Sequence, residues 1–167
     1  MPKNKLTTYQ KKRNFKKTCE PKRGLIKGPR KALFIVQKHY ASHLHYDFRL
    51  SIGGVLKSWV VPKGMPRAFG IKRLAIQTED HPLSYAYFEG TIPEGEYGAG
   101  KVKIWDRGEF YNLKNTSLKS SLKQGKVEVF LKGEKMKGAY ALIRFQDKNW
   151  LVFKVEAARI TRIEGKL

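Results

Sequence analysis

The chain has 167 residues, of which 35 are Lys or Arg and 14 are Asp or Glu, so its formal net charge is +21 at pH 7. Its hydrophobic fraction of 41% is enough to build one core, which excludes a wholly disordered chain. A single cysteine excludes a disulfide scaffold, and no apolar run approaches the ~18 residues of a membrane span. We therefore expect one cytoplasmic, monomeric domain whose partner is anionic, with nucleic acid preferred over a membrane surface.

More than half of the excess charge lies at the N-terminus. Residues 1–31 contain 12 Lys or Arg and only one acidic residue, Glu20. Because apolar side chains are few in this segment, we predict a basic, partly flexible arm that grips a duplex or folds over a groove. A solubilising tail is the alternative. Residues 32–167 are expected to form a single domain.

Short runs rich in β-branched and aromatic residues recur from Leu33 onward, bounded by Gly, Pro, Asn and Asp. The Gly53-Gly54 pair predicts a tight hairpin, and residues 116–123 are compatible with one short helix. Many short strands with minor helix indicate an all-β barrel or sandwich. Strands are expected at residues 33–38, 44–52, 55–61, 73–78, 101–106, 126–132, 139–145 and 150–155.

The strand predicted around residues 44–52 separates an apolar face from a polar one, because side chains alternate along a strand. The side chains expected to enter the core are Leu44, Tyr46, Phe48 and Leu50. The opposite face carries His43, His45, Asp47 and Arg49. Two imidazoles, a carboxylate and a guanidinium in one row are unusual for a solvated surface.

This polar row predicts a metal site beside an anion site. His45 and Asp47 offer a nitrogen and an oxygen on the same face, and His39 in the preceding strand can supply a third ligand for Mn²⁺, Zn²⁺, Fe²⁺ or Co²⁺. Arg49 has the fork geometry that binds phosphate, so the combination points to phosphoester chemistry. A polar face on which His45 pairs with Asp47 is an equally weighted alternative for so short a motif. His43 is interpreted as a surface residue.

A second polar cluster is Glu79-Asp80-His81-Pro82. The proline favours an extended conformation at His81, which could bind the scissile phosphate or donate a proton to a leaving oxygen. A loop histidine that pairs with Glu79 or Asp80 is the alternative, and composition alone favours it.

Three further features carry weaker signals. The segment 92–100 is rich in Gly but acidic and lacks the Lys of a P-loop, so it is interpreted as a structural turn. Lys63 and Arg73 each stand at a strand end, where they could contact a phosphate backbone or remain solvated charges.

Several motifs together resemble one known family. They are FIVQKH (34–39), LHYDFRL (44–50), LKSWVVPKG (56–64), RLAIQTEDHPLSYAYFEGTIPEGEYGAG (73–100), VKIWDRG (102–108), LKGEKMKGAYALIRF (131–145) and WLVFK (150–154). From about residue 9 to residue 154, the chain resembles the 3′-phosphoesterase domain associated with bacterial DNA ligase D, the ligase of non-homologous end joining. QKH-x5-HYDFR together with EDHPLxY is a highly specific combination.

The resemblance implies a compact closed β-barrel of about eight strands with a polar active-site groove. It implies that His39, His45 and Asp47 bind a divalent metal, Mn²⁺ in the family, with Zn²⁺ or Co²⁺ as alternatives. The residues that it implies for phosphate binding, catalysis or support of the site are Gln37, Arg49, Lys63, Arg73, Glu79, His81 and Tyr85.

The family removes a 3′-terminal ribonucleoside as a phosphodiesterase and then removes the remaining 3′-phosphate as a phosphomonoesterase. The positions that resemble those used chiefly for the second step are Arg13, Asn14, Glu20 and Glu79. Asn14 stands where the family has Asp, which puts the second step in doubt more than the first. His43 stands where an Arg is common.

The resemblance also predicts the setting of the activity. The substrate would be the 3′ end of a primer–template or duplex, with a terminal ribonucleotide or a 3′-phosphate. With no room for a ligase or polymerase domain in 167 residues, the chain is expected to act as a stand-alone form beside a separate repair ligase and polymerase. A non-catalytic module that binds DNA ends is the alternative, favoured by the basic arm and by Asn14.

Overall fold

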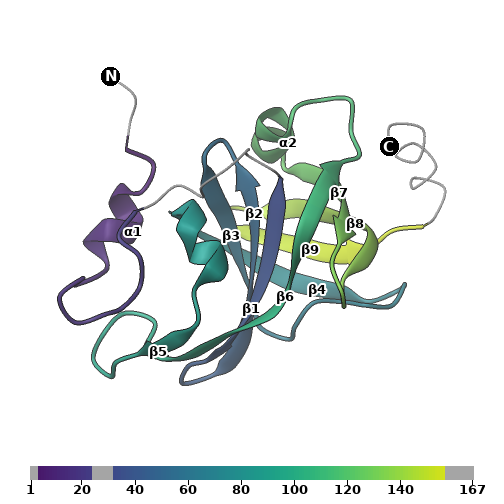
Figure 1. Ribbon diagram of the computed structural model, residues 1–167. Coiled ribbons are helices and arrows are strands. Elements are labelled where there is room, and N and C mark those ends of the chain that lie inside the picture. Colours follow the sequence, from purple (N-terminus) through teal and green to yellow (C-terminus); the bar gives the residue numbers. More distant parts are fainter. Residues whose placement is uncertain (1–3, 24–31, 157–167) are drawn as a thin grey trace.

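Eight antiparallel strands close into a barrel in the computed structural model, which describes residues 4–23 and 32–156 (Figure 1). The strand order is β1-β2-β3-β4-β9-β8-β7-β6, and β6 pairs back with β1 to close the barrel. The strands are β1 (Leu33–Tyr40), β2 (Leu44–Ile52), β3 (Val55–Val61), β4 (Lys72–His81), β6 (Gly100–Asn112), β7 (Lys126–Lys132), β8 (Lys137–Gln146) and β9 (Asn149–Lys154). The predicted closed all-β barrel of about eight strands is confirmed.

Four small elements complete the described chain. The strand β5 (Gly90–Ile92) pairs with the first residues of β6, outside the barrel. The 3-10 helix η1 (Leu83–Tyr87) and the helix α1 (Thr7–Lys11) lie beside the barrel, whereas α2 (Leu118–Gln124) connects β6 to β7 (Figure 1). The sequence patterns anticipated α2 and missed both α1 and β5, because five and three residues are too few to show a periodicity.

The barrel interior is filled by aromatic and aliphatic side chains. At its centre the fully buried rings of Trp59 and Trp150 meet edge to face, with ring centroids 5.6 Å apart. The prediction that Leu44 enters the core is wrong, because its side chain is 49% exposed. Leu44 and Tyr40 form the residue pair nearest the turn between β1 and β2, where the hairpin extends beyond the packed interior. The surrounding interior side chains include Phe34, Val36, Phe48, Leu50, Val129, Leu131, Tyr140 and Leu142. An interior this full leaves the outer face for a site.

A second apolar cluster covers part of the outer face of the barrel. Ile35 of β1 and Leu56 of β3 pack there with Tyr9 of α1 and with Leu83 and Tyr85 of η1. Tyr9 is fully buried, so residues 4–23 of the predicted basic arm are docked on the barrel. Residues 1–3 and 24–31 of that arm lie outside the described residues.

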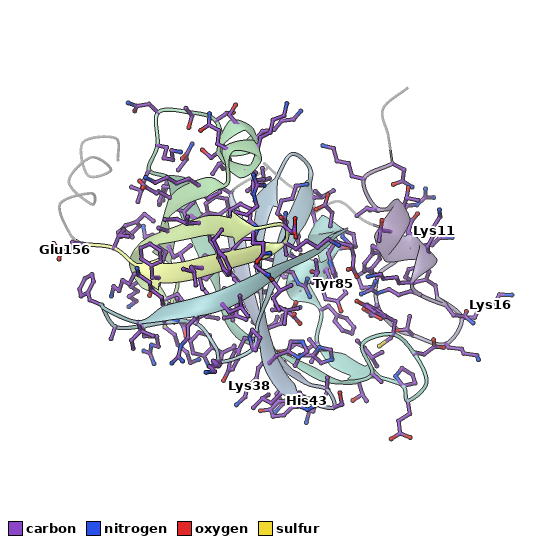
Figure 2. The ribbon with its side chains drawn as sticks, turned by 180° about the vertical axis from the view of Figure 1, so that it is seen from behind. Lys11, Lys16, Lys38, His43, Tyr85 and Glu156 are labelled. Carbon is purple, nitrogen blue, oxygen red and sulfur yellow. The ribbon has the colours of Figure 1, made fainter. Side chains whose placement is uncertain are left out.

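The docked arm keeps most of its charge toward solvent. Lys11 and Lys16 lie on the side of the arm that is turned away from the barrel (Figure 2).

Among residues 4–23 and 32–156, no helix has the length and apolar character needed to cross a bilayer.

One buried carboxylate holds the loop between β7 and β8. Asp106 accepts hydrogen bonds from the backbone amides of Glu134, Lys135 and Met136 at 3.0, 3.0 and 2.7 Å. A Cβ at Gly133 would approach the Asp106 carboxylate to 2.4 Å, so the loop needs glycine at this position. The carboxylate therefore replaces strand pairing where β7 turns into β8.

We expect Asp106→Ala to lower the free energy of unfolding by about 2–4 kcal/mol, because three backbone amides lose a charged acceptor in a buried place. Urea denaturation followed by circular dichroism measures the change. Glu134→Ala is the matched control, since it keeps the amide that Asp106 binds and removes only an exposed side chain. Equal unfolding midpoints for the two variants would contradict this role of Asp106.

Candidate active site

The predicted metal ligands meet on the outer face of the β1–β2 hairpin. The antiparallel register places His39 directly opposite His45 and Gln37 opposite Asp47. His39 Nδ1 lies 3.1 Å from His45 Nε2. The carboxylate oxygens of Asp47 lie 3.6 Å from the first nitrogen and 3.5 Å from the second. One ligand atom from each of the three residues thus lies within 4.8 Å of the other two.

Backbone carbonyls fix the protonation of both imidazole rings. His39 Nε2 lies 2.7 Å from the carbonyl oxygen of Gly98, and His45 Nδ1 lies 3.1 Å from that of His43. Since a carbonyl cannot donate, each of these nitrogens carries the hydrogen, and the lone pairs of the other two face each other. Metal-binding histidines are held by such outer hydrogen bonds. The donor set therefore fits a divalent cation.

The charges of this group are coupled. Burial alone would raise the pKa of Asp47, but the contacts with His39 and His45, which donate to the carboxylate when a ring takes up a second proton, and the charge of Arg49 outweigh it and hold the pKa well below its usual value. The hydrogen bond to Asp47 raises the pKa of His45. Asp47 is thus a carboxylate at any pH near neutrality, and a proton competes with a metal at His45.

Arg49 continues the polar row and is held from three sides. Its Nε donates to the side-chain oxygen of Gln37 at 2.8 Å, and an Nη lies 3.7 Å from Asp47. Its guanidinium lies 4.8 Å from the ring centre of Tyr85. Gln37 is itself fixed, because its amide donates to the carbonyls of Tyr85 and Phe88 at 3.0 Å each. The guanidinium is preorganised next to the metal ligands, as bidentate binding of a phosphate requires.

A β-bulge in β4 directs His81 to the same face. Ser58 pairs with Thr78 and Leu56 pairs with His81, so three residue steps on β4 match two on β3. Without the extra residue, Thr78 and His81 would point to opposite faces. The imidazole Nδ1 of His81 lies 2.9 Å from the carbonyl oxygen of Glu79 and therefore carries the hydrogen.

His81 is consequently a neutral imidazole whose Nε2 carries no hydrogen. Burial, together with the charges of Arg49 and Arg13, lowers the pKa of His81 well below its usual value. The guanidinium of Arg13 lies 3.3 Å from Nε2, so this nitrogen accepts a hydrogen bond.

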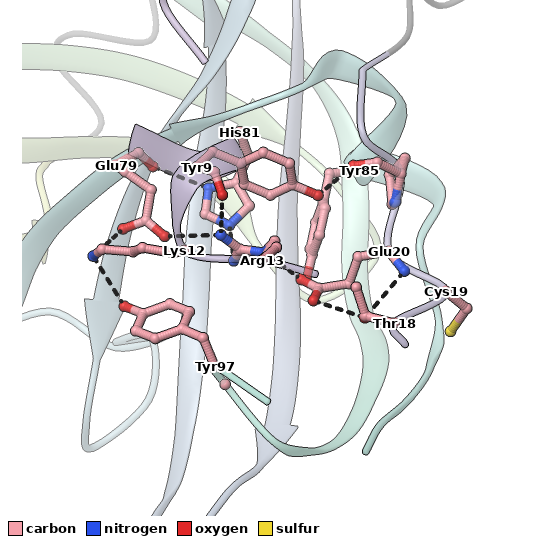
Figure 3. Close-up of polar contacts among 12 residues, drawn as sticks. Tyr9, Lys12, Arg13, Thr18, Cys19, Glu20, Glu79, His81, Tyr85 and Tyr97 are labelled. Carbon is pink, nitrogen blue, oxygen red and sulfur yellow. Dashed lines mark hydrogen bonds and ion pairs between the residues drawn. The ribbon is translucent and has the colours of Figure 1, made fainter. Parts of the chain in front are cut away.

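The N-terminal arm supplies Arg13 to the site (Figure 3). Arg13 donates to Glu20 at 2.9 Å and to Glu79 at 3.3 Å, which joins the arm to β4. Glu20 also accepts from the Tyr85 hydroxyl at 2.7 Å and from Thr18 at 2.9 Å. A buried guanidinium is costly unless it is paired, and these two carboxylates pair it.

The adjacent Lys12 connects the two sides of the site. Its ammonium lies 3.2 Å from Glu79 and 3.3 Å from the hydroxyl of Tyr97 (Figure 3). Burial would raise the pKa of Glu79, but a hydrogen bond from its own backbone amide and the charges of Lys12 and Arg13 lower it.

These side chains surround a cavity of about 240 Å³. Its lining joins the outer faces of β1–β4 to the arm, η1 and the segment that leads into β6. Eight of the predicted site residues line it: Arg13, His39, His45, Asp47, Arg49, Glu79, His81 and Tyr85. Gln37 and Glu20 are buried behind this lining and support Arg49 and Arg13.

The structure does not bring three predicted residues into the cavity lining. Asn14 is exposed, and its side-chain oxygen accepts from the amide of Lys16 at 3.1 Å. Lys63 is exposed in the turn after β3. Arg73 lies two residues before Ala75, on the face of β4 that is turned toward the barrel interior. Their roles remain predictions from the resemblance.

Sequence reasoning missed two contributors, Tyr97 and Gly98. Both line the cavity, and the carbonyl of Gly98 accepts a hydrogen bond from His39, a candidate metal ligand. They belong to the Gly-rich segment that was interpreted as a structural turn. The one signal in the sequence was Tyr97 itself, because a turn rich in glycine does not need an aromatic side chain.

Comparison with known proteins agrees with the resemblance. Residues 37–144 match the DNA ligase D 3′-phosphoesterase domain. The multifunctional non-homologous end joining protein LigD of Pseudomonas aeruginosa is 46% identical over 93% of this chain, which covers 19% of that protein. The LigD of Mycolicibacterium smegmatis is 42% identical over 96% of this chain, which covers 22% of that protein. The LigD of Mycobacterium tuberculosis is 45% identical over 92% of this chain, which covers 20% of that protein. The chain thus spans about a fifth of these relatives, and it belongs to the family of DNA ligase D 3′-phosphoesterase domains.

Proposed function

We propose that this protein is a metal-dependent phosphoesterase that processes 3′ ends of nucleic acid during non-homologous end joining. The observation that carries the proposal is the junction of the His39–His45–Asp47 group with Arg49 in one cavity. A cation site and a preorganised guanidinium that share one cavity suit a phosphoryl group. Family membership points to the same class of reaction.

Arg49 and His81 divide the work on the phosphate. The fixed guanidinium of Arg49 binds two phosphoryl oxygens and stabilises the charge that develops in the transition state. His81 is neutral in the free protein, and its Nδ1 hydrogen is committed to the carbonyl of Glu79. Its Nε2 is therefore suited to accept a proton from an attacking water and to pass it to the leaving oxygen.

We propose Mn²⁺ as the cation, held by His39, His45 and Asp47. Two nitrogens and one carboxylate oxygen form a mixed set that suits a borderline metal better than Mg²⁺ or Ca²⁺. When bound, the ion supplies Lewis acidity to a phosphoryl oxygen or lowers the pKa of a bound water.

The reaction proposed first is removal of a 3′-terminal ribonucleoside, which leaves a 3′-phosphate. The second is removal of that phosphate to give a 3′-hydroxyl. Arg13 lines the cavity and is available for the more highly charged monoester, and Glu20 and Glu79 hold it in place. The exposed side chain of Asn14 accepts a hydrogen bond from the amide of Lys16 but carries no charge, so the second step is the one that this position weakens. A ligase and a polymerase would then act on the exposed hydroxyl.

His45→Ala should abolish cleavage of a labelled primer–template that ends in one 3′-ribonucleotide, assayed with Mn²⁺ and with EDTA. The reason is the loss of one of three ligands from a half-buried position that the barrel core does not use. His43→Ala is the matched control: this exposed histidine contributes only its backbone carbonyl to the site, and the variant keeps that carbonyl.

Cleavage that persists in EDTA, or equal loss in both variants, would contradict the assignment. Salt-sensitive binding of the primer without turnover by the wild-type chain would instead support a non-catalytic module that binds DNA ends.

Metal affinity should fall as the pH is lowered from 8 to 5.5. The hydrogen bond to Asp47 raises the pKa of His45 above its usual value, so a proton competes increasingly with the metal for this ligand as the pH falls. The pKa of Asp47 is lowered, so its carboxylate adds no proton competition there. We expect at least a ~10-fold weaker Kd for Mn²⁺ at pH 5.5, together with proton release on binding, in calorimetry with buffers of different ionisation enthalpy. A Kd that does not vary with pH would exclude His45 as a ligand.

A further inference from the structure

The charge of the chain is divided in a way that bears on how a substrate enters the cavity. Residues 74–100 contain no Lys or Arg, although the whole chain has 35, and they contain five of its 14 acidic residues. This segment runs from β4 through η1 and β5 to the start of β6. It forms one wall of the cavity through Glu79, Tyr85, Tyr97 and Gly98, among others.

The acidic side chains of this wall differ in their contacts. Glu79 is paired with Lys12 and Arg13, and Asp80 is paired with Lys57 at 2.9 Å. The remaining acidic residues include Glu94 and Glu96, which flank the turn just before Tyr97. A strand of nucleic acid carries a charge at every phosphate, so this turn repels it. An uncharged group at the end of the strand meets no such repulsion.

Tyr97 presents an aromatic ring at this place. It is 46% exposed, and it lines the cavity. Of the large exposed apolar side chains among residues 4–23 and 32–156, it is the one that belongs to the cavity lining. The other tyrosine of the lining, Tyr85, is only 2% exposed, so its ring is not accessible to a ligand.

The ring of Tyr97 is held in position from two directions. Lys12 lies 4.7 Å from the ring centre and donates to the hydroxyl, and the guanidinium of Arg13 lies 5.3 Å from the ring centre. The next residue, Gly98, binds His39 through its carbonyl. The ring is therefore fixed both to the arm and to a metal ligand, within the reach of a group attached to a phosphate in the cavity.

We propose that Tyr97 is the stacking surface for the base of the 3′-terminal nucleoside, the uncharged leaving group of the diester reaction. This inference rests on the proposed function and adds the direction of the substrate. The terminal nucleoside lies against the acidic wall of residues 74–100, and the phosphates of the strand lie away from it. Tyr97 accordingly determines binding of the nucleoside and takes no part in proton transfer.

Steady-state cleavage of two primers tests the assignment. Both end in one ribose beyond the scissile phosphate, and the terminal ribose carries adenine in one and no base in the other. Tyr97→Ala should raise KM for the adenine-bearing primer by about 10-fold, the usual worth of one base stacked on an aromatic ring, with little change in kcat. For the primer without a terminal base, Tyr97→Ala and wild type should have the same KM. Tyr97→Phe keeps the ring and loses only the hydrogen bond from Lys12, so it should raise KM for the adenine-bearing primer less than Tyr97→Ala does.

Tyr87→Ala is the matched control, because Tyr87 is 50% exposed and contacts a cation, Arg107, at 4.8 Å, but lies outside the cavity lining. It should leave both KM values unchanged. An equal rise in KM for both primers in Tyr97→Ala, or a rise shared by Tyr87→Ala, would overturn the proposal.

A measurement without turnover separates this inference from the proposed activity. A primer that ends in 5-iodouridine is irradiated with the wild-type protein in EDTA, and the adduct is located by tandem mass spectrometry. We expect the adduct on Tyr97. An adduct on another residue, or none, overturns the stacking proposal even if cleavage is observed, whereas an adduct on Tyr97 in a chain that does not cleave refutes the activity alone.

Discussion

The site depends on two imidazole nitrogens that face each other at 3.1 Å with their lone pairs, beside a carboxylate. Backbone carbonyls on the far side of each ring prevent the tautomers that would relieve this arrangement. Only a cation satisfies it, either a proton on His45 or a metal ion shared by the group. The hairpin register places His39 opposite His45, and the carbonyl of Gly98 holds the His39 ring. The lowered pKa of Asp47 keeps its carboxylate charged, so two nitrogens and one oxygen are directed at one point.

The second constraint is that the barrel interior is full, so the site has to be built on an outer face and then covered. The N-terminal segment provides the cover through the buried ring of Tyr9, and it also brings a guanidinium that must be paired. Glu20 from the same segment and Glu79 from β4 pair it. Docking of the arm and completion of the cavity are therefore one event, which gives the basic N-terminus a structural role in addition to any contact with nucleic acid.

The parts of the fold that the sequence predicts well are those fixed by neighbours along the chain. β2 and β3 begin and end at the predicted residues, because a Gly-Gly turn and strict alternation set their register. The same alternation predicted the ligands His45 and Asp47. Contributions that depend on distant contacts were not predictable. The bulge in β4 redirects His81 by one extra residue, and α1 is too short and too polar to reveal that Tyr9 is buried.

The acidic wall shows why net charge alone is a poor guide to this site. A chain of charge +21 attracts nucleic acid as a whole, and attraction without direction would not bring a strand end to the candidate metal ligands. The longest stretch without Lys or Arg, 74–100, meets the cavity at Tyr97 and Gly98, beside His39. In the proposed orientation an uncharged nucleoside lies at this wall and the phosphates of the strand lie away from it, so the local reversal of sign favours the terminus of a strand over its middle. General attraction and local repulsion together would place the last phosphate, rather than an internal one, beside Arg49 and the candidate metal ligands.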